Sequence, residues 1–249
     1  MSETGKKLPS SCMAKTTSYH GRITTEEQSQ ENNYMKYIDI EHWSRKEHFQ
    51  FFSRRTFPFY NITLPLDVTN LYKRVKEDGL SFYYAMTYIV TNVMSGIEDF
   101  RYKIRNDGVV IVDRLHPSFV TFDETTHLLK IIDIEITPGM DLSSFCAAAS
   151  KAEREMTSHF STSESSVRDD FVYISCTPWF SFTSMSHAAD CNPNDSAPRI
   201  AWGKFEWKDG KVTIPFNVQL NHRLLDGYHV HLLMEGIENF IQGYQEKIS

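Results

Sequence analysis

The stretch KVTIPFNVQLNHRLLDGYHVH, residues 211–231, decides the fold of this chain. Its first half alternates between apolar and polar side chains, and the apolar positions are Val212, Ile214, Phe216, Val218 and Leu220. Residues two apart point to the same face of a β-strand, so this period of two predicts a strand with one face against the core. The opposite, polar face carries Thr213, Asn217 and Gln219. The second half changes to a helical pattern after the pair Asp226-Gly227.

A histidine lies where the strand pattern ends. His222 comes two residues after Leu220, so its ring continues the apolar face and should point toward the packed side. Asp226 then occupies the N-cap position of a final helix, whose buried stripe contains Val230, Leu233, Ile237, Ile241 and Tyr244. A core histidine, a capping aspartate and a turn glycine explain this pattern without any function. A partly buried neutral imidazole can also accept a proton from a hydroxyl or a thiol, so both interpretations stay open at this point.

Turn residues and apolar periodicity predict the secondary structure of the rest of the chain. The pairs Asp107-Gly108 and Asp209-Gly210 each lie between alternating runs, which predicts two β-hairpins. Short strands are predicted over residues 37–43 and 60–66, and helices over residues 41–54, 68–79, 82–93 and 141–158. Helices mixed with hairpins favour an α+β fold, a two-layer sandwich in which helices pack on a mixed, largely antiparallel sheet.

Composition excludes several classes of protein. The formal net charge is -6 and there is no long Lys/Arg cluster, so no nucleic-acid partner is expected. The most apolar window, residues 82–97, contains Thr87, Thr91 and Asn92, which indicates a buried helix and no membrane span. The four cysteines, Cys12, Cys146, Cys176 and Cys191, lack CxxC spacing, which is typical of reduced thiols in a cytoplasmic protein.

The first 33 residues differ from the rest of the chain. They are polar and have no apolar periodicity, so we expect a flexible N-terminal extension over residues 1–33 and one folded domain over residues 34–249. A metal site is not expected in that domain either. His229 and His231 are two apart and diverge on a helix, so they cannot join His222 and Asp226 around one ion.

Several motifs together resemble one family. HRLLDG fits the H-x-x-x-D-G signature of chloramphenicol acetyltransferases and of the related dihydrolipoyl acyltransferases. HWSRKEHFQFF, SFYYAM, EDFRYKI, YISCTPWFSFTSM, WGKF and IPFNVQLNH resemble segments of chloramphenicol acetyltransferases in the same order, over residues 35–247. The resemblance implies acetyl transfer from acetyl-CoA, without a metal, to the hydroxyl of a small molecule such as chloramphenicol, with antibiotic resistance as the associated role. It also implies a homotrimer with its sites at the subunit interfaces.

The resemblance assigns roles to individual residues. His222 matches the catalytic base, and Ser175 matches the serine whose hydroxyl stabilises the oxyanion. Asp226 matches an aspartate that pairs with an arginine, here Arg45, and supports the histidine loop. Positions that bind coenzyme A correspond to Trp179, Lys204 and Phe205. Positions that bind the acceptor correspond to Phe52, Tyr60, Val120, Met185 and Ala201.

The chain departs from the family at several of these positions. Phe52, Val120 and Ala201 stand where hydroxyl-bearing residues are common, and each change removes a hydrogen bond worth about 1 kcal/mol net. Ser81 replaces an expected basic residue, and Arg199 replaces an aliphatic one. Arg199 leads to the hypothesis that the acceptor is a hydroxyl-bearing molecule with an anionic group.

Other functions remain as alternatives. A hydrolase built on Ser175, His222 and Asp226 lacks the GxSxG elbow typical of such enzymes. The acyltransferase core of a ketoacid dehydrogenase would follow a lipoyl-bearing domain, for which the sequence has no pattern. A non-catalytic family member that binds a small ligand would be free to lose its site residues, whereas His222, Ser175 and Arg45 are all present.

Overall fold

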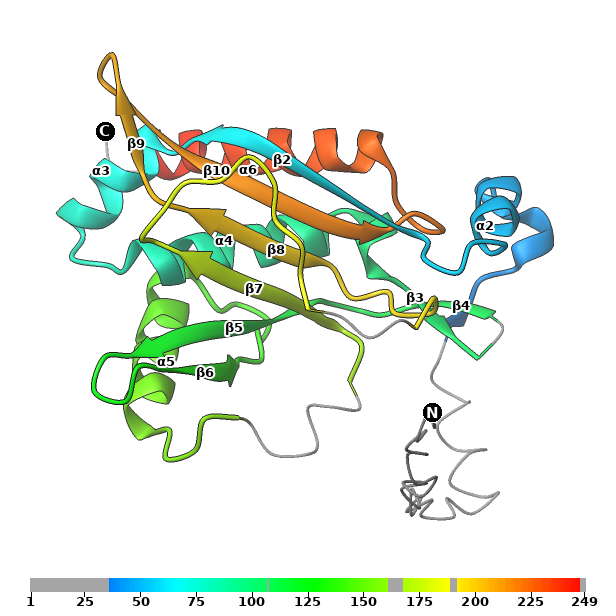
Figure 1. Ribbon diagram of the computed structural model, residues 1–249, viewed down its shortest axis with the longest axis horizontal. Coiled ribbons are helices and arrows are strands. Elements are labelled where there is room, and N and C mark those ends of the chain that lie inside the picture. Colours follow the sequence, from blue (N-terminus) through cyan, green and yellow to red (C-terminus); the bar gives the residue numbers. More distant parts are fainter. Residues whose placement is uncertain (1–35, 107, 161–167, 189–191, 247–249) are drawn as a thin grey trace, which may run out of the picture. The chain divides into compact units, whose positions relative to one another are not determined.

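The computed structural model describes residues 36–106, 108–160, 168–188 and 192–246 (Figure 1). The larger sheet is built from β2 (Phe59–Asp67), β5 (His116–Asp123), β6 (Leu128–Asp133), β7 (Phe171–Thr177), β8 (Arg199–Gly203), β9 (Glu206–Lys208) and β10 (Lys211–Asn221). A smaller sheet is built from β1 (Lys36–Tyr37), β3 (Tyr102–Arg105) and β4 (Gly108–Ile111). The helices are η1 (Ile40–His42), α2 (Lys46–Phe52), α3 (Thr69–Glu77), α4 (Phe82–Gly96), η2 (Glu98–Arg101), α5 (Leu142–Glu155) and α6 (Gly227–Glu246).

The larger sheet is mixed, as predicted. Its strand order is β2-β10-β8-β7-β5-β6, and β9 pairs with β10. β10 runs antiparallel to β2, β8 and β9, and β5 runs antiparallel to β6, whereas β7 runs parallel to both β5 and β8. Figure 1 shows α4, α5 and α6 behind this sheet, so the helices form one layer and the strands the other. The predicted two-layer α+β sandwich is confirmed.

β10 lies between β2 and β8 in the larger sheet, and both of its faces are buried. The predicted apolar face is confirmed, because Val212, Ile214, Phe216, Val218 and Leu220 are at most 1% exposed. The polar face is buried as well, since Asn217 is 0% and Gln219 is 6% exposed. The connection between β7 and β8 covers that face: the Asn61 amide donates to the Met185 carbonyl at 2.7 Å, and His187 lies 2.8 Å from Asn217. This connection runs across the front of the sheet (Figure 1).

The turn and cap predictions are largely confirmed. Asp209 and Gly210 have φ angles of 51° and 78°, the positive values that a tight hairpin turn requires. β3 and β4 form the other predicted hairpin, although residue 107 lies outside the described residues. The Asp226 side chain accepts a hydrogen bond from the Tyr228 backbone N–H at 3.0 Å, so it caps α6 as expected.

The predictions for residues 37–54 were partly wrong. The alternation of residues 37–43 predicted a strand, but β1 ends at Tyr37 and η1 follows. The helix expected from residue 41 begins only at Lys46. The cause of the early strand end is local. The Asp39 side chain accepts a hydrogen bond from the Glu41 backbone N–H at 3.0 Å, and a short turn begins there in place of further strand pairing.

Three further sequence predictions concern the N-terminal extension, a membrane span and a metal site. The expected extension over residues 1–33 lies outside them, so it stays a prediction. Within the described ranges, no helix has both the length and the apolar character needed to cross a bilayer. No group of three or more His, Cys, Asp or Glu side chains in those ranges could hold a metal ion.

Strand β3 of the smaller sheet carries a fully buried lysine. Lys103 on β3 is 0% exposed, and its ammonium donates to the Ser196 carbonyl at 3.3 Å. No ion-pair partner of Lys103 is found among the described residues. Burial lowers the pKa of Lys103 to about 8, although the charges of Asp169, Asp170 and Asp195 partly oppose this shift. The charged ammonium therefore destabilises the folded state at neutral pH.

Replacement of Lys103 by methionine should stabilise the protein in a pH-dependent way. Below pH 8 the lysine is charged in both the folded and the unfolded state, so the full cost of burying the ammonium lowers the free energy of unfolding. This cost disappears as the pH rises from the folded pKa toward the unfolded pKa. We expect Lys103→Met to raise the free energy of unfolding by about 3 kcal/mol at pH 7 and by about 1 kcal/mol at pH 10. Urea unfolding at several pH values measures this difference, with the exposed Lys151→Met as the control. A difference that does not change with pH would contradict the assignment.

Candidate active site

His222 follows the last residue of β10 and is held by two backbone carbonyls. Its backbone N–H donates to the Pro58 carbonyl at 2.7 Å, and its Nδ1 lies 3.0 Å from the Leu225 carbonyl. A carbonyl oxygen only accepts hydrogen bonds, so Nδ1 must carry the hydrogen. In the neutral ring the lone pair is then on Nε2, and this nitrogen can act as a base.

Two aromatic rings surround the His222 imidazole. Phe52 stacks on it with the ring centroids 3.9 Å apart and an interplanar angle of 17°. The Tyr60 ring lies 4.7 Å away at 42°. The Tyr60 hydroxyl is buried and has no hydrogen-bond partner in the described part of the chain. Burial, together with the nearby charge of Asp226, raises the pKa of Tyr60 well above its ordinary value, so this hydroxyl stays protonated and can donate a hydrogen bond.

A series of contacts between charged side chains fixes the loop after His222. Arg45 donates to Asp226 at 3.0 Å, so the predicted contact between these residues is present. His229 Nδ1 lies 3.0 Å from the same carboxylate, and its Nε2 lies 3.4 Å from Asp99. Burial acts to raise the pKa of Asp226, but the hydrogen bond from Arg45 and the charge of His229 outweigh it and hold this pKa below its ordinary value. Sequence reasoning missed Asp99 and His229 as parts of this support.

Ser175 lies on β7, far from His222 along the sheet. It lines a cavity of about 370 Å³ together with Val120, Met185 and His187. Ala201 on β8 is the register partner of both Ser175 and Asn217, so these three residues form a row across the sheet. Val120 and Met185 therefore lie with Ser175, whereas Phe52 and Tyr60 lie with His222.

A second histidine was missed by sequence reasoning. The Asn217 amide nitrogen donates to the Ile62 carbonyl at 3.3 Å, which leaves the Asn217 amide oxygen to face His187 Nε2 at 2.8 Å. His187 Nε2 must then carry a hydrogen, and burial lowers the pKa of His187, so its ring is neutral. The cavity of Ser175 thus contains a neutral imidazole. Its position in an irregular connection gave no periodic signal.

Arg199 lies in the same cavity but its charge is already paired. Its guanidinium donates to Asp195 at 2.6 Å and lies 5.4 Å from the centre of the Tyr173 ring. An ion pair offsets the attraction that Arg199 would exert on an anionic group. The hypothesis of an anionic acceptor therefore loses the observation that motivated it.

A larger cavity lies at the ends of β7 and β8. Its volume is about 500 Å³, and its lining includes Trp179, Lys204 and Phe205, the three residues expected to bind coenzyme A. Val120 lines this cavity as well as the cavity of Ser175. The two cavities therefore approach each other at β5.

Ser175 and His222 of one chain are well separated. Asn217 lies two strands from Ser175 in the register, and His222 follows it five residues later. With strands about 4.8 Å apart and a rise of about 3.4 Å per residue, the two residues are roughly 20 Å apart. One chain therefore cannot bring both side chains to one reacting atom, and a Ser175, His222, Asp226 triad within one chain is excluded.

Comparison of the sequence with known proteins gives consistent matches to one family. A sequence model described as chloramphenicol acetyltransferase matches residues 32–238. A chloramphenicol acetyltransferase from Klebsiella sp is 28% identical over 208 residues, covering 84% of this chain and 94% of the relative. One from Staphylococcus aureus is 30% identical over 211 residues, covering 82% and 98%.

A solved structure shares the fold. This structure, named chloramphenicol acetyltransferase, has a TM-score of 0.76 at 24% identity and covers 83% of this chain and 99% of its own. The family match spans most of the chain and includes β10, the His222 loop and the first part of α6. The chain is therefore a member of the chloramphenicol acetyltransferase family.

Proposed function

We propose that this protein transfers the acetyl group of acetyl-CoA to a hydroxyl of chloramphenicol. The observation that carries the proposal is the fixed tautomer of His222, whose Nδ1 hydrogen is bound by the Leu225 carbonyl and whose Nε2 is left as a base. Nε2 removes the proton from the acceptor hydroxyl while its oxygen attacks the thioester carbon. Family membership supports the substrate pair, because the relatives are named for acetyl transfer to this antibiotic.

Ser175 stabilises the charge that develops in this step. The thioester oxygen becomes an oxyanion in the tetrahedral intermediate, and the Ser175 hydroxyl donates a hydrogen bond to it. When the intermediate collapses, the carbon–sulfur bond breaks and the His222 imidazolium returns the proton to the thiolate of coenzyme A. The products are free coenzyme A and the acetyl ester. The large cavity with Trp179, Lys204 and Phe205 would hold the coenzyme, and its thioester end would lie near Val120.

The site is formed by two copies of the chain in a homotrimer. The separation of roughly 20 Å between Ser175 and His222 supports this proposal, because strand spacing fixes it within one chain. His222 with Phe52 and Tyr60 would supply one half of the site, and Ser175 with Val120, Met185 and Ala201 the other half. We further propose a cytoplasmic location, which the free thiols of Cys146 and Cys176 support.

The function is tested by the release of coenzyme A thiol from acetyl-CoA with and without chloramphenicol. Wild-type protein should release the thiol only when chloramphenicol is present. His222→Ala should lower kcat about 10²- to 10⁴-fold, the usual contribution of a general base. His231→Ala, at an exposed position on α6, is the matched control and should retain wild-type activity. Absence of chloramphenicol-dependent release from folded wild-type protein would overturn the proposed acceptor, and an active His222→Ala variant would overturn the base.

Removal of the Ser175 hydroxyl should affect the chemical step. Loss of one oxyanion donor costs about 10²- to 10³-fold in kcat, so Ser175→Ala should lower kcat by this factor with little change in the KM for acetyl-CoA. Ser184→Ala, in an exposed part of the same connection, serves as the control. Steady-state kinetics give both constants. An increase in KM alone would indicate that Ser175 binds the coenzyme and does not stabilise the oxyanion.

The ion pair between Arg45 and Asp226 should act as a unit. Each of Arg45→Ala and Asp226→Ala removes one partner of a partly buried pair, so we expect each to lower kcat about tenfold or more through displacement of the His222 loop. The double variant should then be little worse than either single variant, because the interaction is already lost. A thermodynamic cycle on kcat measures the coupling. Effects that add in full would contradict a positioning role for the pair.

A further inference from the structure

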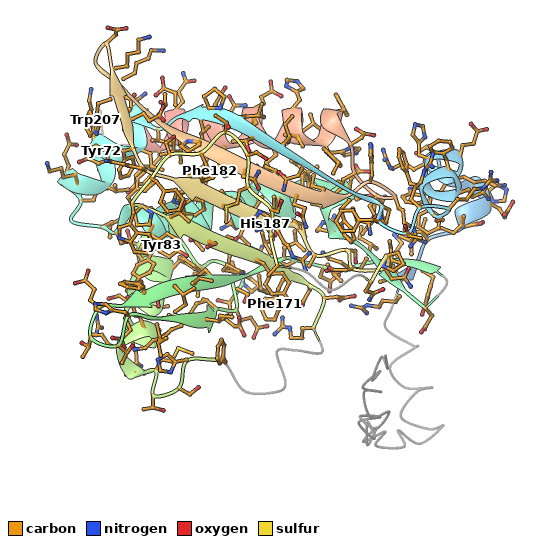
Figure 2. All side chains as sticks on the ribbon, viewed as in Figure 1. Tyr72, Tyr83, Phe171, Phe182, His187 and Trp207 are labelled. Atoms are coloured by element: carbon orange, nitrogen blue, oxygen red, sulfur yellow. The ribbon has the colours of Figure 1, made fainter. Side chains whose placement is uncertain are left out.

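The cavity of Ser175 contains a histidine that the proposed reaction does not use. His187 belongs to the connection between β7 and β8, and Figure 2 shows it near the middle of the sheet that this connection crosses. Its ring contacts Asn217, which lies in one row with Ser175 through their shared register partner Ala201. Residues paired in this way point to the same face of a sheet, and neighbouring strands are about 4.8 Å apart. The imidazole therefore lies on the face that carries Ser175, at a distance of about two strands.

The hydrogen bond to Asn217 determines which nitrogen of His187 is free. Nε2 carries the hydrogen, because it faces the amide oxygen of Asn217 at 2.8 Å. In the neutral ring, Nδ1 then holds a lone pair. Among the described residues, Nδ1 has no hydrogen-bond partner, and it is not an enclosed atom, so a ligand in the cavity can reach it.

The surroundings of His187 keep this lone pair available at neutral pH. Burial lowers the pKa of His187, and although the hydrogen bond to Asn217 opposes this shift, the charge of Arg199 adds to it. The ring is therefore neutral at pH 7. A hydroxyl group can rotate to donate or to accept a hydrogen bond, whereas the lone pair of Nδ1 only accepts. His187 therefore stabilises a ligand group that donates a hydrogen bond.

The residues expected to bind the acceptor on this side of the site do not offer such a contact. Val120, Met185 and Ala201 have no strong hydrogen-bonding group in their side chains. The Arg199 guanidinium only donates, and it is already in an ion pair. The serine and tyrosine hydroxyls of the lining can pair with donors and with acceptors alike, so they discriminate little between them. Nδ1 of His187 is the group in this lining that requires a donor.

We infer that His187 selects an acceptor that carries a second hydrogen-bond donor, an O–H or an N–H, besides the hydroxyl that is acetylated. The inference rests on the proposed function and adds to it a residue that determines specificity. Nδ1 of His187 accepts the hydrogen of this second donor, while the reacting hydroxyl faces His222 of the partner subunit. Chloramphenicol has two groups of this kind, its other hydroxyl and its amide N–H. An acceptor without either group leaves Nδ1 unpaired and binds more weakly.

Acceptor analogues combined with a variant of His187 test this contact. KM and kcat are measured for chloramphenicol, for the deoxy analogue in which hydrogen replaces the hydroxyl that is not acetylated, and for the N-methylated amide. His187→Phe keeps a ring but removes the lone pair, so it should raise the KM for chloramphenicol about tenfold while kcat and the KM for acetyl-CoA are unchanged. With wild-type protein, one of the two analogues should show the same increase, and this analogue identifies the donor. His231→Phe, at an exposed position on α6, is the control and should behave as wild type.

The combination of variant and analogue separates recognition from a structural role. If His187 binds the missing donor, the His187→Phe variant should have the same KM for that analogue as for chloramphenicol. Effects that add in full for both analogues would overturn the inference. Equal KM values of wild-type protein for all three acceptors would overturn it without any variant. A loss of kcat with an unchanged KM would also overturn it, because His187 would then act in the chemical step.

The outcomes also separate this inference from the proposed function. If chloramphenicol binds but is not acetylated, calorimetric titration of the same proteins with the same three acceptors gives the test through Kd. Weaker binding of one analogue by wild-type protein, without such a difference for His187→Phe, would then support the inference although the proposed function had failed. If chloramphenicol neither reacts nor binds, both are overturned.

Discussion

The spacing of hydrogen-bonded strands determines how this protein can work. Ser175, Ala201 and Asn217 are locked into one row by the registers of β7, β8 and β10. His222 lies five residues beyond Asn217 along a strand that cannot shorten, which places it roughly 20 Å from Ser175. No change of side-chain rotamer closes a distance of this size. Under the proposed function, the separation divides one chain into two half-sites, each with its own supporting contacts.

The two half-sites are supported in different ways. Around His222, the Leu225 carbonyl sets the tautomer, Phe52 and Tyr60 enclose the ring, and the contacts of Asp226 with Arg45 and with His229 fix the following turn. Around Ser175, the connection between β7 and β8 covers a buried polar face of the sheet. A polar layer of this kind is stable because its members are hydrogen-bonded to one another, as Asn217 is to Asn61 and to Thr63. His222 is thus held by aromatic and charged groups, and Ser175 by the sheet itself.

Local patterns in the sequence predicted the parts of the structure that local chemistry determines. The alternation of β10, the Asp209-Gly210 turn and the cap at Asp226 all follow from spacing within a few residues. The resemblance to a family supplied the contact between Arg45 and Asp226, which are 181 residues apart. Neither local patterns nor the resemblance identified His187. Its place in the cavity of Ser175 depends on a hydrogen bond to Asn217, on a strand 30 residues later. The pairing of Arg199 with Asp195 likewise depends on the shape of an irregular connection, and it removed the basis for an anionic acceptor.

The central claim is that two copies of the chain complete one site, and complementation of inactive variants tests it most directly. His222→Ala and Ser175→Ala chains are unfolded together in equal amounts, refolded, and assayed for chloramphenicol-dependent release of coenzyme A thiol. In a ring of three chains assembled at random, about a quarter of the sites combine an intact Ser175 from one copy with an intact His222 from its neighbour. The account therefore predicts recovery of about a quarter of the wild-type activity from two variants that are each inactive alone. Activity that stays at the level of the separate variants would show that both residues must come from one chain, and would contradict the account.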